Sequence, residues 1–481
     1  MSERGFDVVV VGAGTSGGVV AARLSEDPGC DVLLLEAGPD FPDEADSPPA
    51  FLTGGGAMGE NLAGVGAATP DLDWNYHSEP LESGRRVHVR RGRLVGGSSM
   101  INGCVCVRGR PADYDAWEER GATGWGWEAL RPDFELVERE VTIRRYPEES
   151  LQPLQRIFVD GFAELGFRRT EDLNHPDAWD GVVGPWPQNR RNEVRQGSLV
   201  TYLRRARGRP NLEVRGRALV DRVLMSGSRA VGVRYMDVDG DVVEVPAGAV
   251  VLSAGAYGSP PILLRSGIGP ADDLRALGLA AVAHLPVGLH LMDHAQALFR
   301  IEMPPEVARL VGPWYAVAAR GASFWSFPLS VDEEVGRGVL AFGSIVEDMG
   351  GSIKLAGVDP GTAPRIRHQY DEAIRRGDFE EAWSTFHAVL GTTALSASGV
   401  RSGEGDRSLA DVLEERLGTA FHPAGGCPIG GVVDERLAVH GVEGLLVADA
   451  SIFPGHVTNN PNLTCFVVGE RAARFVTAQS A

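Results

Sequence analysis

The stretch that decides the fold is residues 6–36, which read FDVVVVGAGTSGGVVAARLSEDPGCDVLLLE. Val8–Val11 is a short β-branched apolar run, which is typical of a buried parallel strand. Val32–Leu35 is a second run of this kind, and the pattern of Val19–Leu24 between them indicates an amphipathic helix. The order strand, helix, strand predicts a βαβ unit.

The loop between the first strand and the helix carries the glycine spacing G-x-G-x-x-G at Gly12, Gly14 and Gly17. The first glycine permits a tight turn, the second lets the backbone approach a pyrophosphate, and the third lets helix pack on strand. The helix N-terminus offers unpaired N–H groups and a positive dipole end to the phosphates. Glu36 ends the second strand, where a carboxylate can accept bonds from ribose hydroxyls. A glycine-rich turn alone is a weak signal, but these features in register predict a dinucleotide site.

Composition limits the possible partners and compartments. The chain of 481 residues is long enough for two domains, and its formal net charge of −19 argues against nucleic acid or an anionic membrane as partner. Five cysteines are too few, and odd in number, for a disulfide framework, and Cys104-x-Cys106 has no second pair at zinc spacing. We therefore expect free thiols and no metal. The first expected strand at Phe6 leaves no room for a signal peptide, and no apolar run approaches a membrane span, so we expect a cytoplasmic protein.

Two later stretches add strands. Asn211–Val250 alternates with period two and is broken at Ser226-Gly227 and Asp239-Gly240, which predicts hairpins in a small antiparallel insertion. Ala249–Leu252 then returns to a buried strand, and Leu445–Val447 is another short one. These runs predict additional strands for the N-terminal sheet.

Other segments read as loops or helices. Residues 37–73 are rich in Gly and Pro without a clear period, so they either cover the nucleotide or form surface. Helices are expected to begin at Tyr257–Pro261, with the prolines near the first turn, to run over Phe379–Leu390 and to start at Asn462. We expect the part of the chain from about 296 to 414 to face the substrate. Three tryptophans read as packing anchors: Trp117, Trp125 and Trp127.

Further glycine-rich patterns follow in a characteristic order. GRLVGGSS at Gly92–Ser99 is followed by Asn102, and GAYGSP at Gly255–Pro260 continues to SGIG at Ser266–Gly269. LPVG at Leu285–Gly288 is followed by Asp293-His294. Together with the first glycine loop, these patterns resemble the glucose–methanol–choline (GMC) family of FAD-dependent oxidoreductases. The resemblance runs from residue 6 to about residue 475.

The resemblance implies an α/β fold with an α+β substrate part. A Rossmann-like FAD-binding domain is joined to a discontinuous substrate domain built on an antiparallel sheet, and FAD is extended with its isoalloxazine under that sheet. Members with covalent flavin carry a histidine just before the asparagine of the GRLVGGSS pattern; Ile101 stands there, so we expect noncovalent FAD. The expected FAD-binding domain is 1–155, 205–295 and 415–481, and the expected substrate domain is 156–204 and 296–414.

The resemblance also assigns residues to FAD. The backbone of Val220 is expected at the adenine, Asp449 and Ala450 beside the pyrophosphate and flavin, and Asn462 at the pyrimidine side of the ring. The full expected set is Gly12, Gly14, Thr15, Ser16, Gly17, Glu36, Ala37, Arg93, Val95, Gly96, Gly97, Ser98, Asn102, Gly103, Val105, Val220, Ala254, Asp449, Ala450, Asn460, Asn462 and Leu463.

Two further residues match the catalytic positions of the family. His422, in the pattern HPxG, matches the catalytic histidine, and Asn460, in NPNLT, matches the second position, which is His or Asn. Alcohol oxidation requires removal of the hydroxyl proton, which a neutral imidazole can accept near pH 7, and transfer of a hydride to flavin N5. A second polar group must hold the oxygen so that the C–H bond points at the flavin. His456 lies nearby in sequence and is expected in a surface loop.

The segment between Asp293 and Gly351 is shorter than in most members, which suggests an open site. Its aromatic residues are candidates for pocket lining, although such residues are more often core: Trp314, Tyr315, Trp325 and Phe327.

The leading hypothesis is FAD-dependent oxidation of a small-molecule alcohol to an aldehyde or ketone, with O2 or another electron acceptor reoxidising the flavin. Three alternatives stay open: a hydroxynitrile lyase with structural FAD, an NAD(P)-dependent reductase that uses only the first glycine loop, and a flavin-binding protein without turnover. Bleaching of the yellow protein by an alcohol separates the first hypothesis from the others.

Overall fold

The N-terminal βαβ unit forms as the sequence predicts. β1 (Phe6–Val11) and β2 (Val32–Leu35) pair in parallel, with Val8 opposite Val32, and α1 (Thr15–Leu24) connects them. The computed structural model describes residues 5–43, 72–346 and 350–480. The loop predicted over residues 37–73 therefore falls mostly outside the described residues.

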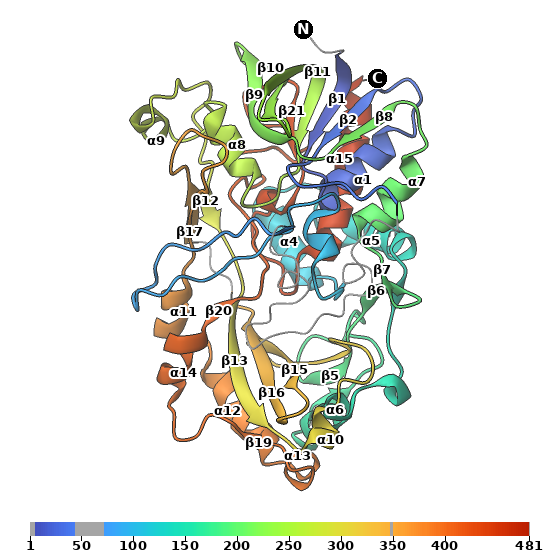
Figure 1. Cartoon of the computed structure of the whole chain (residues 1–481), viewed down its shortest axis with the longest axis vertical. Coiled ribbons are helices and arrows are strands. Elements are labelled where there is room, and N and C mark those ends of the chain that lie inside the picture. The colour runs from blue at the N-terminus through green and yellow to red at the C-terminus, as the bar shows by residue number, and fades with distance from the viewer. Residues whose placement is uncertain (1–4, 44–71, 347–349, 481) are drawn as a thin grey trace.

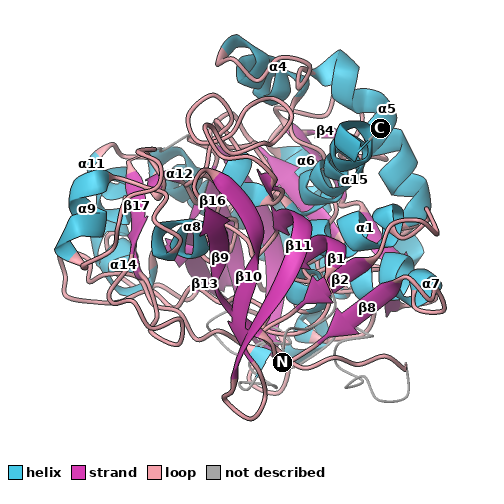
Figure 2. Ribbon diagram, turned by 90° about the horizontal axis from the view of Figure 1, so that it is seen from above, coloured by secondary structure: helices cyan, strands magenta, loops and turns pink. Residues whose placement is uncertain are grey.

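The first sheet has seven strands in the order β8-β2-β1-β11-β10-β9, with β21 paired to β11 (Figures 1 and 2). The predicted hairpin turns are confirmed, because β9, β10 and β11 pair antiparallel around them. The remaining strands pair in parallel. The bounds are β8 (Leu212–Arg215), β9 (Leu219–Ser226), β10 (Arg229–Met236), β11 (Val242–Leu252) and β21 (Leu445–Val447).

Two local predictions about this sheet are wrong. β8 was expected in the antiparallel insertion, but it pairs in parallel with β2 at the sheet edge, since an edge strand alternates in polarity whichever way it runs. α1 was expected to be amphipathic, but only Thr15 and Arg23 are partly exposed. α15 (Asn462–Ser480) packs on its other side, so closely that a Cβ on Gly469 would lie 2.7 Å from the Ser16 carbonyl oxygen.

The second sheet has eight strands in the order β19-β13-β16-β15-β14-β5-β4, with β20 paired to β13. Its pairs are antiparallel except β4 with β5. The bounds are β4 (Arg168–Arg169), β5 (Val182–Pro185), β13 (Ala295–Glu302), β14 (Val317–Arg320), β15 (Phe324–Asp332), β16 (Arg337–Ser344), β19 (Arg401–Ser402) and β20 (Gly418–Thr419).

The two faces of the second sheet pack differently. On one face, Phe299 of β13 contacts Trp383 and Phe386 of α12 (Glu380–Leu390), and α6 (Pro153–Glu164) also covers this face. The other face carries Trp325 and Phe327 toward the middle of the molecule. The second sheet is therefore closed by helices on one side and faces the first sheet's end of the molecule on the other (Figure 1).

Helices and small sheets complete the described chain. The helices predicted at Pro260-Pro261, over residues 379–390 and from Asn462 are confirmed. Trp117 and Trp125 are fully buried, as expected for packing anchors. The remaining longer helices are α4 (Pro111–Glu119), α5 (Trp127–Glu140), α8 (Ser259–Arg265), α9 (Ala271–Ala276), α11 (Tyr370–Arg375) and α14 (Leu409–Arg416). The short elements are β3 (Ile143–Arg144), β6 (Gln188–Arg191), β7 (Val194–Arg195), α7 (Arg204–Ala206), β12 (Leu289–Leu291), α10 (Pro305–Ala308), β17 (Gly351–Lys354), β18 (Arg365–Arg367) and α13 (Thr393–Ala397).

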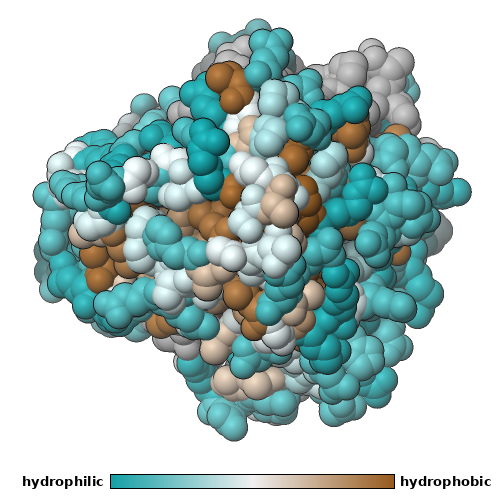
Figure 3. Space-filling view, turned by 90° about the horizontal axis from the view of Figure 1, so that it is seen from below, coloured by the Kyte–Doolittle hydropathy of each residue, from teal (hydrophilic) through white to brown (hydrophobic). Residues whose placement is uncertain are grey.

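A helix that spans a membrane is both long and apolar. Among the described helices, none combines the length and the apolar character that crossing a bilayer requires. Seen from below, apolar side chains appear in separate groups between hydrophilic ones (Figure 3).

Candidate active site

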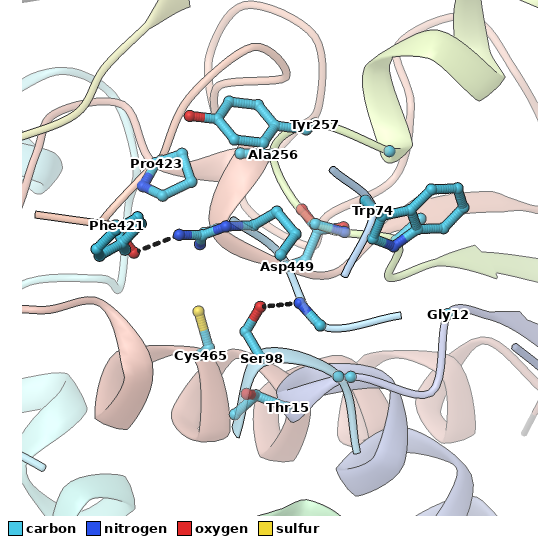
Figure 4. Close-up of a pocket in the computed structure, with 18 of the residues that line it drawn as sticks. Gly12, Thr15, Trp74, Ser98, Ala256, Tyr257, Phe421, Pro423, Asp449 and Cys465 are labelled. Carbon is cyan, nitrogen blue, oxygen red and sulfur yellow. Dashed lines mark hydrogen bonds between the residues drawn. The ribbon is translucent and has the colours of Figure 1, made fainter. Parts of the chain in front are cut away.

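A cavity of about 360 Å³ connects the glycine loop of the first sheet with the aromatic face of the second. Gly12 and Thr15 lie at one end of it, and Trp325 and Phe327 at the other. Figure 4 shows Ser98, Asp449 and Cys465 between the glycine loop and Phe421. Segments from the N-terminal, middle and C-terminal parts of the chain therefore share one site.

The glycine-loop end has the shape that a pyrophosphate needs. A Cβ on Gly14 would meet nothing within 4 Å, and no side chain caps the N-terminus of α1, so its first N–H groups are left for a ligand. Gly12 has φ +93°, and a Cβ on Gly17 would lie 1.9 Å from the Gly12 carbonyl oxygen. Gly17 is thus a packing residue, while Gly14 borders the open space.

Glu36 stands at the end of β2 and lines the same cavity. Its carboxylate accepts hydrogen bonds from the backbone N–H of Ala13 and of Gly38, each at 3.0 Å. Burial raises the pKa of this carboxyl to about 7, and the two backbone hydrogen bonds oppose that shift. The carboxylate is held rigidly at the end of β2, and its contact with a ribose stays a prediction.

Most of the residues that the sequence assigned to the cofactor line this cavity, together with His422 and Asn460. Five do not: Gly17, Arg93, Val95, Gly96 and Leu463. Val95 and Leu463 are fully buried in the apolar core, and Arg93 places its guanidinium 5.2 Å from the Trp74 ring centroid. These five residues lie outside the cavity lining, and their expected contact with the cofactor stays a prediction.

Asp449 and Asn102 brace the loops around the cavity. One Asp449 oxygen accepts from the Gly255 N–H at 2.8 Å and from the Ser259 hydroxyl at 2.5 Å. Asn102 Oδ1 accepts from the Cys104 N–H at 3.0 Å and from the buried guanidinium of Arg195. Arg195 was not anticipated from the sequence, because nothing in its local pattern shows that it reaches Asn102.

Three histidines meet at the other end of the cavity. His422 Nδ1 lies 2.9 Å from His294 Nδ1, and His456 Nε2 lies 2.7 Å from the His422 carbonyl oxygen. The rings of His294 and His456 are 3.9 Å apart between centroids. The expectation that His456 belongs to a surface loop is therefore wrong, since the turn before α15 folds it against His294.

Asp293 fixes the backbone of the catalytic candidate. One of its oxygens accepts from the His422 backbone N–H at 2.9 Å, and the other accepts from the hydroxyls of Tyr370, at 2.7 Å, and Thr419. The motif Asp293-His294 was visible in the sequence, but its contacts with His422 were not. They join positions 128 and 129 residues apart.

The electrostatic environment keeps the histidine pair neutral. Burial lowers the pKa of His422 to about 3, with Asp293 opposing and with His456 and Arg91 adding to the shift. Burial also lowers the pKa of His294 well below its usual value, helped by the other two histidines. An imidazole in this pair is thus available as a base at neutral pH.

Family comparisons agree with this geometry. Models of the GMC oxidoreductase family match residues 6–296 with the N-terminal domain and residues 348–469 with the C-terminal domain.

The chain belongs to the GMC oxidoreductase family.

Relatives of this GMC oxidoreductase cover nearly its whole length. A GMC-type oxidoreductase of Rhodococcus erythropolis, itself uncharacterised, is 32% identical over 98% of this chain and 99% of its own. An oxygen-dependent choline dehydrogenase of Burkholderia pseudomallei is 31% identical over 98% of this chain and 94% of its own. The crystal structure of pyridoxine 4-oxidase from Mesorbium loti, 27% identical, has a TM-score of 0.83 and covers 98% of both chains.

This GMC oxidoreductase is an FAD-dependent enzyme of a class that acts on CH–OH donors. The residues present fit FAD: the open space at Gly14, the uncapped N-terminus of α1 and the carboxylate of Glu36 suit the pyrophosphate and a ribose. His422 and Asn460 line the same cavity, and His294 lies behind His422.

Proposed function

We propose that this enzyme oxidises an alcohol CH–OH group to an aldehyde or ketone, with His422 as general base and Asn460 holding the alcohol oxygen. The observation that carries this proposal is the position of His422, which lines the same cavity as the glycine loop and whose pKa burial lowers to about 3. FAD, when bound, supplies the hydride acceptor. The protein's own task is to take the hydroxyl proton and to aim the C–H bond, and we assign these tasks to His422 and Asn460, which both line the cavity.

The tautomer of His422 follows from its contact with His294. A hydrogen bond between two Nδ1 atoms needs a proton on one of them and a lone pair on the other. His294 also hydrogen-bonds the backbone of Val457, and this bond favours a proton on the ring nitrogen of His294 that faces Val457. The nitrogen that faces His422, Nδ1, then keeps its lone pair. We infer that His294 Nδ1 is the acceptor and that His422 Nδ1–H donates. His422 Nε2 then keeps its lone pair for the substrate hydroxyl.

Asp293 supports the proton transfer from behind. Its carboxylate holds the His422 backbone, and its negative charge favours the imidazolium that forms when His422 takes the proton. Asp293 also accepts hydrogen bonds from the hydroxyls of Tyr370 and Thr419. Its carboxylate therefore stays fixed while the charge on His422 changes.

Anaerobic bleaching of the flavin by alcohols tests the proposal. The holoenzyme should bleach, and His422→Ala should retain FAD but reduce it about 10²–10⁴-fold more slowly, because the base is lost. His440→Ala, at an exposed histidine, is the matched control and should bleach at the wild-type rate. Equal rates in wild type and His422→Ala would refute the base assignment, and a lyase would release cyanide from a cyanohydrin without bleaching. Admission of air then distinguishes O2 from another electron acceptor by the speed at which colour returns.

We also propose that FAD is held without a covalent bond. The side chain of Ile101, which lines the cavity at the position of the family's covalent histidine, has no nucleophilic atom. Acid precipitation should leave the yellow flavin in the supernatant; flavin in the pellet would contradict this. We retain as a proposal the division into an FAD-binding domain (1–155, 205–295 and 415–481) and a substrate domain (156–204 and 296–414).

A further inference from the structure

Aromatic rings wall the cavity next to His422. Trp325 lies 5.9 Å from the His422 ring and stacks on Phe327 at 5.7 Å between centroids. Trp186 and Tyr315 each lie 5.2 Å from Phe327. All four rings line the cavity, and we refer to Trp186, Tyr315, Trp325 and Phe327 as the aromatic cage.

The second sheet holds the aromatic cage in place. Trp325 and Phe327 alternate along β15, so both point to the cavity face, and a Cβ on Gly343 of β16 would lie 2.0 Å from Trp325 Cζ2. Tyr315 lies against Gly103, where a Cβ would be 2.8 Å from Tyr315 Cε2. Glycines at both contact points leave space for the rings, so a larger residue at either position would displace a ring of the cage.

The charges around the aromatic cage decide what it can hold, because such a cage suits either an aromatic ring or a quaternary ammonium group. Among the cavity-lining residues that the structure describes, the carboxylates are Glu36 and Asp449, and both accept backbone N–H groups away from the cage. Arg91 also lines the cavity and donates at 2.8 Å to the carbonyl of Phe421, the residue before His422. Asp293 lies behind His422, and its two oxygens already accept hydrogen bonds. Among the described residues of this cavity, Arg91 would repel a cation, and the two carboxylates are already engaged by backbone N–H groups.

One uncharged polar side chain completes this end of the cavity. Gln296, on β13, is 5% exposed and lines the cavity. A side-chain amide that lines a cavity offers both N–H donors and a carbonyl acceptor to a ligand. The amide can serve a neutral hydroxyl or ether group.

We propose that the substrate is a neutral alcohol with an aromatic ring on the carbinol carbon and that the aromatic cage holds this ring. Gln296 is then available to a polar substituent of the ring. Cationic alcohols are poor substrates. This inference rests on the proposed alcohol oxidation and deepens it. It separates this chain from the relatives that are named for choline.

Two matched pairs of alcohols test the inference with the holoenzyme. At subsaturating concentration, benzyl alcohol should reduce the flavin anaerobically about tenfold faster than cyclohexylmethanol does. Under the same conditions, 3,3-dimethylbutan-1-ol should reduce it about tenfold faster than its cationic isostere choline does. Choline equal to or faster than its isostere, or cyclohexylmethanol equal to benzyl alcohol, would overturn it.

Variants locate the effect. Gln296→Glu adds a carboxylate and should move the ratio of choline to 3,3-dimethylbutan-1-ol toward choline by about tenfold, whereas Gln296→Met should not. Trp325→Leu should remove most of the preference for benzyl alcohol, and Trp325→Phe, which keeps a ring, should retain it. If Trp325→Leu fails to fold, Gln296→Glu and Trp325→Phe decide. Unchanged ratios in Gln296→Glu, or loss of the preference in Trp325→Phe, would count against the cage.

Binding without turnover separates a failure of this inference from a failure of the proposed function. The dissociation constant of benzaldehyde, read from the shift of the flavin spectrum, should be about tenfold lower than that of cyclohexanecarbaldehyde. If no alcohol bleaches a flavin that dithionite does reduce, while benzaldehyde keeps this advantage, the aromatic cage stands and the oxidation proposal fails. If alcohols bleach the flavin but both aldehydes bind equally, the aromatic cage fails and the oxidation proposal stands.

Discussion

At the scale of single residues, His294 is the positioning partner of the proposed base. His294→Leu removes the acceptor at His422 Nδ1, so His422 can adopt the other tautomer and lose its lone pair at Nε2. We expect flavin reduction about 10²-fold slower, a fall in kcat with little change in KM, and unchanged FAD content. His294→Asn, whose side-chain oxygen can accept from Nδ1–H, should restore most of the rate. A merely structural role would lower FAD content or stability in both variants alike.

The low pKa of His422 predicts the pH profile. A base is active when deprotonated, so with a pKa of about 3 His422 is active throughout the range from about pH 5 to 8. The rate constant for flavin reduction at subsaturating alcohol should therefore be flat over this range. An acid limb near the ordinary histidine pKa, about 6.5, would show that His422 is not buried as neutral imidazole.

The residues of the site were predictable to different degrees. His422, Asn460 and Glu36 stand in short patterns whose chemistry is legible in the sequence. His294, Arg91 and the cage residue Trp186 act through contacts with residues far along the chain, which a local pattern does not contain.

At the scale of elements, two glycines of the glycine loop have different roles: Gly17 serves the packing of α1 on β1, and Gly14 borders the proposed cofactor space. Gly17→Ala places a Cβ 1.9 Å from the Gly12 carbonyl oxygen, so α1 must move off β1, and we expect a loss of stability of more than about 2 kcal/mol together with loss of FAD. Gly14→Ala meets no protein atom within 4 Å, and because alanine is a poorer N-cap than glycine it should cost no more than about 1 kcal/mol of stability. It should still bind FAD at least about tenfold more weakly, since its methyl group enters the pyrophosphate space. Urea unfolding without FAD and flavin titration measure the two effects, and equal destabilisation by both substitutions would contradict them.

The elements themselves were largely predictable, because β-branched runs, period-two alternation and turn glycines act locally. The exceptions have a long-range cause. α1 is buried on its second side by α15, which lies at the other end of the chain, and β8 joins the parallel sheet although its alternation resembles that of the neighbouring hairpins.

At the scale of the whole molecule, the site exists only because the two sheets face each other. The sequence offered Tyr315, Trp325 and Phe327 as candidate pocket lining, and Gln296 and Trp186, which line the same cavity, are the members of this wall that no pattern indicated. That arrangement depends on packing between segments that no short motif describes.

The histidine pair also makes the stability of the whole fold depend on pH. His422, with a folded pKa of about 3, and His294, with a strongly lowered pKa, stay neutral in the folded state while both take a proton below about pH 6.5 when the chain unfolds. The unfolded state then binds more protons, so each histidine lowers the free energy of unfolding by about 1.4 kcal/mol per pH unit as the pH falls below about 6.5. The buried carboxyl of Glu36, whose pKa is raised to about 7, acts in the opposite direction, so a difference between variants is needed to isolate the histidine effect.

His294→Asn provides that difference, because it removes one of the two titrating groups. Between pH 6 and pH 5 the free energy of unfolding of wild type should fall by about 1.2 kcal/mol more than that of His294→Asn. His440→Asn, at an exposed histidine, is the control and should follow wild type. Urea titrations of the holoenzyme at both pH values give the four free energies, and parallel pH dependence in wild type and His294→Asn would show that His294 is not held neutral in the fold.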